Sequence, residues 1–145
     1  MSITVLLAEH HKYCDELFAG AEEGVAKQDW AAAGPALRRL LNALETHFRA
    51  EEDILFPAFE QASGLRSGPT EVMRGEHRQM RELLQMLQQA LADKDSEAFA
   101  GAAETLLILM QQHNLKEENI LYPLCERTLA TEAAVYAAVR SCLES

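Results

Sequence analysis

Residues 47–57 read HFRAEEDILFP, and residues 113–123 read HNLKEENILYP. An offset of 66 residues places the histidine, both glutamates, the Ile-Leu pair and the proline of the first stretch on those of the second. The same offset brings His11 onto His77. Chance does not readily supply so many matches at one offset, so the pattern indicates two copies of one structural unit.

The repeated unit has the pattern of a helical hairpin. Apolar side chains and one histidine recur at spacings of three and four residues, which places them on one face of a helix. They are Leu7, His11, Cys14, Phe18, Ala21 and Val25. Asp29 and its repeat partner Asp95 are good N-caps for the second helix of each unit.

Four main helices follow from this pattern. We expect the second helix to run from about residue 30 to 56, with Pro35 shifting its start or kinking it. Residues 61–69, which contain two glycines and a proline, should form the loop between the units. The third helix should open near Thr70, and the fourth should run from about residue 96 to 122.

No stretch shows the alternation of a β-strand, and residues 131–143 have the pattern of a short fifth helix. The sequence therefore predicts an all-α, up-down four-helix bundle made of two helical-hairpin repeats. We expect residues 1–145 to form a single domain, because 145 residues suffice for one sizeable core.

The composition argues against two classes of binding partner. The chain is 48% hydrophobic and 25% charged, with a formal net charge of -10. That negative charge argues against binding to nucleic acid or an anionic membrane. The N-terminus lacks the basic region of a signal peptide, and three widely spaced cysteines are typical of a reducing compartment. We therefore expect a cytoplasmic protein.

The histidines and glutamates of the repeat are candidate metal ligands. His47 and Glu51 are four residues apart, so both side chains leave the same helix face, roughly 6 Å apart. His113 and Glu117 repeat this spacing. An up-down bundle would bring these pairs and the two core-facing histidines together, and burying them all without a cation would be very costly.

The donor types narrow the choice of metal. Imidazole and carboxylate without thiolate suit iron, manganese or zinc, and disfavour a structural zinc or iron–sulfur site. Six donors are too many for one tetrahedral zinc, but they suit two metals roughly 3.5 Å apart that share carboxylates.

These motifs resemble the hemerythrin-like, or HHE cation-binding, domain family over nearly the whole chain. The resemblance implies a di-iron centre, oxo- or hydroxo-bridged and carboxylate-bridged. The residues implied as ligands are the histidines His11, His47, His77 and His113, with Glu51 and Glu117 as bridges. The oxygen-carrying members have a fifth histidine one turn from the position of His77, where this chain has Met73 and Arg81. The resemblance therefore implies open metal positions and favours reaction or sensing over oxygen carriage.

Other polar or aromatic residues have less specific interpretations. His10 is expected at the surface, since the repeat and the apolar face both select His11. Glu52 and Glu118 are either solvated or orient a histidine, whereas Glu45 is expected on the surface. The remaining assignments are to core packing: Tyr13, Cys14, Trp30, Met73, Met80, Met86, Met110 and Tyr122. Alternatives are an extra oxygen ligand for the two tyrosines and a redox-sensitive thiol for the cysteine.

Three functions are consistent with this sequence. The leading hypothesis is a di-iron protein that interacts with dioxygen, nitric oxide or peroxide, in a role such as sensing, scavenging, iron handling or repair. The second is a di-iron oxidase or peroxidase, although no general acid or base stands out beyond the ligands. The third is a structural or interaction bundle with zinc in the site.

Overall fold

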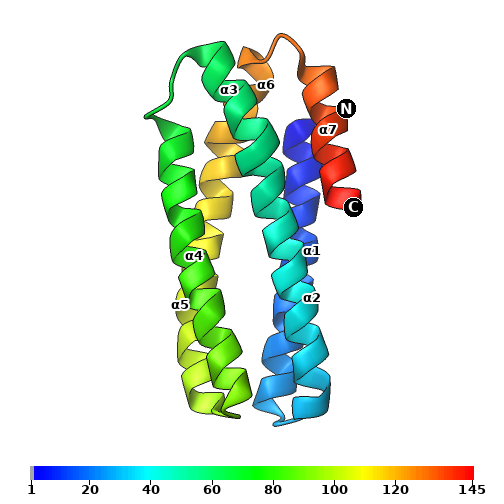
Figure 1. Cartoon of the computed structure of the whole chain (residues 1–145), viewed down its shortest axis with the longest axis vertical. Coiled ribbons are helices and arrows are strands. Elements are labelled where there is room, and N and C mark those ends of the chain that lie inside the picture. The colour runs from blue at the N-terminus through cyan, green and yellow to red at the C-terminus, as the bar shows by residue number, and fades with distance from the viewer. Residues whose placement is uncertain (1) are drawn as a thin grey trace.

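The computed structural model describes residues 2–145, and every regular element within that range is helical. Figure 1 shows two antiparallel hairpins side by side, with the chain running up and down the long axis. The elements are α1 (Ile3–Ala26), α2 (Trp30–Arg49), the π-helical segment η1 (Ala50–Leu55), α3 (Phe56–Ser63), α4 (Pro69–Ala92), α5 (Ser96–Lys116), the π-helical segment η2 (Glu117–Leu121), α6 (Tyr122–Thr128) and α7 (Glu132–Glu144). The predicted all-α bundle of two helical hairpins, with a short C-terminal helix, is confirmed.

The two hairpin turns share one construction. The Asp29 carboxylate accepts a hydrogen bond from the backbone N–H of Ala32 at 3.2 Å, and Asp95 caps α5 in the same way. Just before each cap, Gln28 and Lys94 have positive φ values of 55° and 51°, and they too are 66 residues apart. The repeat therefore extends to the backbone conformation of the turns.

Both long second helices pass through a widened turn before their proline. α2 continues through η1 into α3, and α5 continues through η2 into α6, so helical structure extends beyond the predicted ends at residues 56 and 122. A proline normally clashes with the carbonyl four residues earlier. Here that carbonyl belongs to Asp53 before Pro57 and to Asn119 before Pro123, both within the π-helical turns. The wider turn relieves the clash and lets the helix continue.

A polar layer divides the core into two apolar parts. One part fills the hairpin-turn end and includes Phe18, Leu40 and Phe99. The other lies under α3, α6 and α7 and includes Phe59 and Val139. The four predicted ligand histidines lie at the boundary between these parts. Along each helix, the buried apolar residues change from one part to the other near the histidine.

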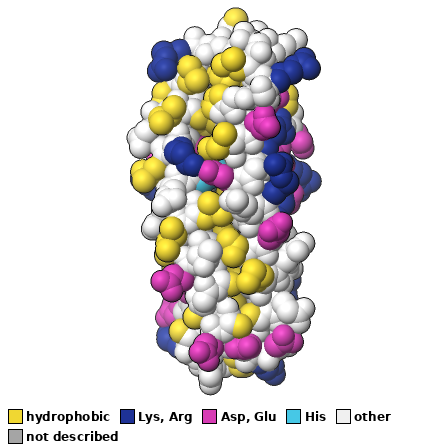
Figure 2. All heavy atoms as spheres, turned by 90° about the vertical axis from the view of Figure 1, so that its left-hand side faces the viewer, with side chains coloured by type: hydrophobic (Ala, Val, Ile, Leu, Met, Phe, Trp, Pro, Cys, Tyr) yellow, Lys and Arg dark blue, Asp and Glu magenta, His cyan; other side chains and the backbone are white. Residues whose placement is uncertain are grey.

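The surface is mixed in character. Figure 2, which faces the α4 and α5 side, shows apolar side chains along the length of the molecule between charged ones. The exposed apolar residues include Val72, Met86 and Ile108. Within residues 2–145, no helix combines the length and the hydropathy needed to cross a membrane.

Candidate metal centre

Six buried polar side chains meet in the layer between the two apolar cores. They are His11, His47, Glu51, His77, His113 and Glu117, each at most 5% exposed. Their donor atoms form two groups in which all members lie within 4.8 Å of one another. One group contains Glu51, His77, His113 and Glu117, and the other contains His11, His47 and Glu117. The six residues singled out in the sequence therefore come together, with Glu117 common to both groups.

The two glutamates lie between the histidine pairs. Glu117 places Oε1 3.1 Å from His11 Nε2 and Oε2 3.2 Å from His113 Nε2. Glu51 places Oε1 3.1 Å from His77 Nε2 and 3.6 Å from His47 Nε2. Each carboxylate thus faces one imidazole from each donor group, as a carboxylate shared by two cations would.

The π-helical turns help to produce this arrangement. Glu51 and Glu117 each lie within or at the start of a π-helical turn, directly after the α-helix that carries His47 or His113. π-helical turns are rare and occur often at functional sites. Two such turns at equivalent places indicate that both carboxylates are positioned by the same backbone device.

The polar contacts within the cluster leave part of it without hydrogen-bond partners. Four buried atoms lack a partner of good geometry: Glu51 Oε1, His77 Nε2, His113 Nε2 and Glu117 Oε2. All four belong to the first donor group. Buried polar atoms without partners are costly, and a cation among two imidazoles and two carboxylate oxygens would satisfy all of them. The residues present therefore fit a metal.

Two of the donors already have the charge state that metal binding requires. Burial lowers the pKa of His47 well below its usual value, which keeps the imidazole neutral, as a ligand must be. Burial opposes ionisation of Glu117, but the facing imidazoles of His113 and His11 hold its pKa well below the ordinary range. His47 therefore offers a neutral nitrogen donor and Glu117 an ionised oxygen donor. Burial lowers the pKa of the other three imidazoles, but the facing carboxylates outweigh it and raise the pKa, to about 9 for His77. Those three imidazoles lose a proton when a metal binds.

A second layer of residues orients the imidazoles through their other ring nitrogen. His11 Nδ1 lies 2.7 Å from Glu118, and His77 Nδ1 lies 2.6 Å from Glu52. His113 Nδ1 lies 2.8 Å from Glu76. A carboxylate on Nδ1 fixes the tautomer that leaves Nε2 free for a metal. Of the two alternatives for Glu52 and Glu118, the structure therefore favours orientation of a histidine.

His10 departs from the surface position expected of it. Its side chain is only partly exposed, and its Nδ1 lies 2.8 Å from Nδ1 of His47. For Nε2 of His47 to bind a metal, Nδ1 of His47 must carry the proton and donate a hydrogen bond to Nδ1 of His10. The repeat offset places His10 on Glu76, which contacts His113 in the other half of the bundle. Once the pairing of the helices is known, the offset therefore predicts the contact between His10 and His47.

Tyr122 differs most from its assignment to packing. The side chain is fully buried, and its hydroxyl lies 2.6 Å from Glu51 Oε2 and 2.8 Å from Glu117 Oε1. The same oxygen is 3.2 Å from His11 Nε2 and 3.4 Å from His47 Nε2. Burial and the two carboxylates raise the pKa of Tyr122 well above its usual value. The raised pKa keeps the phenol protonated in the metal-free protein, but the contacts of the hydroxyl with four candidate ligands favour the alternative of an extra oxygen ligand.

The positions flanking His77 have other roles. Arg81 forms ion pairs with Glu45 and Glu52, with shortest separations of 3.1 and 2.9 Å, and lies over the ring of Phe48. Glu45 is half-exposed, as expected of a surface residue. Burial raises the pKa of the Cys14 thiol to about 12, which argues against a reactive thiolate at neutral pH.

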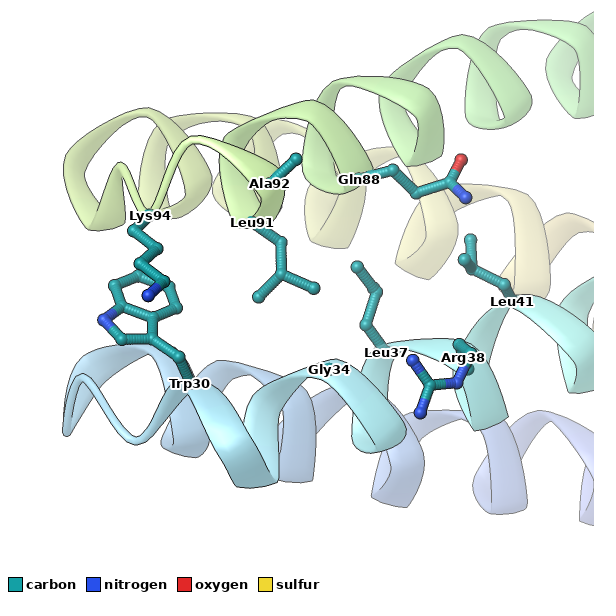
Figure 3. A pocket seen from close by; sticks show the side chains of 9 residues that line it. All are labelled: Trp30, Gly34, Leu37, Arg38, Leu41, Gln88, Leu91, Ala92 and Lys94. Atoms are coloured by element: carbon teal, nitrogen blue, oxygen red, sulfur yellow. The ribbon is translucent and has the colours of Figure 1, made fainter.

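A separate groove lies near the hairpin-turn end of the bundle. Figure 3 shows it between α2 and the end of α4, with Trp30, Leu37 and Leu91 among its lining side chains. Its volume is about 360 Å³. None of the six donor residues lines it. The groove is therefore distinct from the candidate metal centre.

This fold and donor set define a class of metal-binding helical bundles. The profile of the hemerythrin HHE cation-binding domain matches residues 2–125, and the chain belongs to this family. It is 34% identical over 130 residues to the iron-sulfur cluster repair protein YtfE of Edwardsiella ictaluri, covering 82% of this chain and 54% of that protein. It is 32% identical over 105 residues to YtfE of Escherichia coli O81, covering 66% and 46% of the two chains. The chain thus spans about half the length of these relatives, and no solved structure matches it significantly.

Proposed function

We propose that this protein binds a non-haem di-iron centre that reacts with a small ligand such as dioxygen, nitric oxide or peroxide. The proposed metal-binding residues are four terminal histidines and two bridging glutamates: His11, His47, His77, His113, Glu51 and Glu117. The observation that carries the proposal is the pair of buried donor groups that share Glu117, the larger of which holds four donor atoms without hydrogen-bond partners. A bound di-iron centre supplies redox chemistry and positions open to a small ligand.

The protein's own residues hold and orient this centre. The imidazoles present Nε2 to the metals because their Nδ1 atoms contact Glu118, Glu52, Glu76 and His10. The apolar layers above and below the cluster keep bulk water away from it. A dry site of fixed geometry favours a small ligand over a bulky substrate.

The names of the relatives support a role in iron handling or repair. Both are named as iron-sulfur cluster repair proteins, and this chain corresponds to about half of each. We infer that it carries out the iron-dependent part of such a role. Its organisation as one domain of residues 1–145 and its cytoplasmic location stay predictions from the sequence.

Metal stoichiometry tests the proposed centre. Protein purified from iron-supplemented cells should hold about two irons per chain and absorb in the near ultraviolet and visible. His77 belongs to one donor group only, so His77→Ala should keep roughly one metal, whereas Glu117→Ala should lose most of both. Colourless protein with zinc, or wild-type protein with one metal or none, would refute the di-iron assignment.

Ligand titration distinguishes the proposed activities. Nitric oxide should change the visible spectrum of the reduced protein in proportion to its iron content. Sustained peroxide turnover that is lost in His113→Ala would instead favour the oxidase or peroxidase. Reversible dioxygen binding over many cycles would contradict the preference for reaction or sensing.

A further inference from the structure

The two halves of the metal centre are built alike except for one hydroxyl group. The repeat offset places Phe56 on Tyr122. The Tyr122 ring stacks on His11 at 5.8 Å between centroids, and the Phe56 ring stacks on His77 at 5.9 Å. The interplanar angles are 24° and 20°. The two rings thus have equivalent positions, but only one of them carries an oxygen.

The π-helical turn brings Tyr122 to the cluster. In a regular α-helix a residue five positions after Glu117 would point about 140° away from it. Through η2, the backbone N–H of Tyr122 instead donates to the carbonyl of Glu117, and the two side chains meet. Phe56 and Glu51 have the same backbone relation through η1.

The two donor groups also differ in size. The group around His77 and His113 has four side chains, whereas the group around His11 and His47 has three. The Tyr122 hydroxyl lies beside the smaller group, 3.2 and 3.4 Å from its two imidazole nitrogens and 2.8 Å from the nearer oxygen of Glu117. Its shortest contact is a hydrogen bond of 2.6 Å to Glu51 Oε2, on the carboxylate whose other oxygen faces both His77 and His47. Adjacent ligands on one metal, each about 2.1 Å from it, are about 3 Å apart at right angles. The hydroxyl has the separations of a ligand adjacent to all three.

We propose that Tyr122 is a metal ligand, bound as phenolate to the metal held by His11 and His47. The phenol proton leaves to solvent when the metal binds. Phe56 offers no oxygen, so the metal held by His77 and His113 keeps an open position, and an added ligand binds there. The two metals are therefore unequal: one is closed by the chain, and the other faces the small ligand.

The first experiment asks whether iron in this protein carries a phenolate. This inference rests on the proposed di-iron centre, so iron content is measured on every sample. The oxidised wild-type protein should show a visible phenolate-to-iron charge-transfer band, with tyrosine ring modes enhanced in its resonance Raman spectrum. Tyr122→Phe should lose both signals and keep its helical circular dichroism, since phenylalanine occupies the equivalent place in the other half. Tyr13→Phe, which removes an exposed tyrosine, should keep both signals.

Each outcome bears on the proposal separately from the di-iron assignment. Two irons per chain in a wild-type protein without phenolate Raman modes would overturn the ligand role and leave the di-iron centre intact. Persistence of the band in Tyr122→Phe would also overturn it. If that variant fails to fold, the wild-type Raman spectrum still decides the question. Wild-type protein without iron would refute the di-iron centre itself.

A reciprocal variant tests the open position. Azide serves as the probe, because it is a small anion that binds open iron positions. Phe56→Tyr places a hydroxyl beside His77, so azide affinity should fall by about tenfold or more. Tyr13→Phe should leave the affinity within about twofold of the wild type. Unchanged azide binding in an iron-loaded Phe56→Tyr protein would contradict the assignment of the open position.

Discussion

Replacing Glu52 by glutamine should weaken metal binding without unfolding the protein. Both carboxylate oxygens of Glu52 accept hydrogen bonds: Oε2 from His77 Nδ1 at 2.6 Å and from Arg81 at 2.9 Å, and Oε1 from Arg81 at 3.0 Å. Burial alone would raise the pKa of this carboxyl, yet these donors hold it at about 2. In either orientation, the amide nitrogen of glutamine would face an N–H donor. His77 therefore loses its orienting partner or Arg81 is repelled.

The expected magnitude is that of an outer partner of a metal-bound histidine. Such replacements reduce metal affinity by roughly 10- to 100-fold, or about 1.4–2.7 kcal/mol. Glu45→Gln is the matched control, because Glu45 pairs with the same Arg81 but does not contact His77. An exposed ion pair of that kind contributes at most about 1 kcal/mol to stability.

The assay is competitive titration of iron(II) against a chelator, with urea unfolding of the metal-free proteins alongside. Glu52→Gln should lower the affinity of one of two sites, whereas Glu45→Gln should leave both unchanged. Equal affinity in Glu52→Gln and wild type, or equal losses in both variants, would refute the orienting role of Glu52.

Three further substitutions test the fold by urea or thermal unfolding. Gly24→Ala should destabilise by about 1–2 kcal/mol, because the new Cβ would meet the backbone of Ala33 at 3.0 Å, whereas Gly20→Ala, with open space, should be neutral or stabilising. Glu126 accepts hydrogen bonds at the N-terminus of α1, and these bonds lower the pKa of its carboxyl although burial alone would raise it. Glu126→Gln should therefore cost up to about 1 kcal/mol of stability at pH 7. The stability from the ionised Glu126 is present above the pKa of this carboxyl in the unfolded chain. The difference between wild type and variant should therefore vanish as the pH falls through the lowered pKa of the folded protein, and a difference that stays constant would contradict this reasoning. Asp95→Ala removes the cap of α5 and should cost about 1 kcal/mol, and no loss would contradict the capping role.

Much of the fold was predictable because helix periodicity and the repeat agree. The apolar face of α1 and the caps at Asp29 and Asp95 need only local sequence. The predicted helix ends near residues 56 and 122 were wrong, because helical structure continues past Pro57 and Pro123 where the preceding turn is π-helical. Nothing local in the sequence distinguishes a π-helical turn from an α-helical one.

The burial and proximity of the six inner residues were predictable, whereas the contacts of the outer residues were less so. Spacing of four residues and the repeat offset identify the buried histidines and glutamates without knowledge of helix packing. The contacts of His10 and Tyr122 depend on which helices lie opposite, 37 residues away for His47 and 111 for His11. Such contacts are set by tertiary packing, so a single sequence gives only the candidates.

The partners around the imidazoles would also set the net charge of the proposed metal centre. The cluster and its outer partners contain five carboxylates, of Glu51, Glu52, Glu76, Glu117 and Glu118, and the proposed phenolate of Tyr122 adds a sixth negative charge. Two cationic side chains, Arg81 and Lys116, pair with the outer carboxylates. Two divalent ions would come close to neutralising the remaining negative charge. Two trivalent ions would leave the site with a net positive charge, which a bound anion would have to balance. In the proposed di-iron centre, the charge of the protein shell would thus couple the oxidation state of the metals to the uptake of anionic ligands.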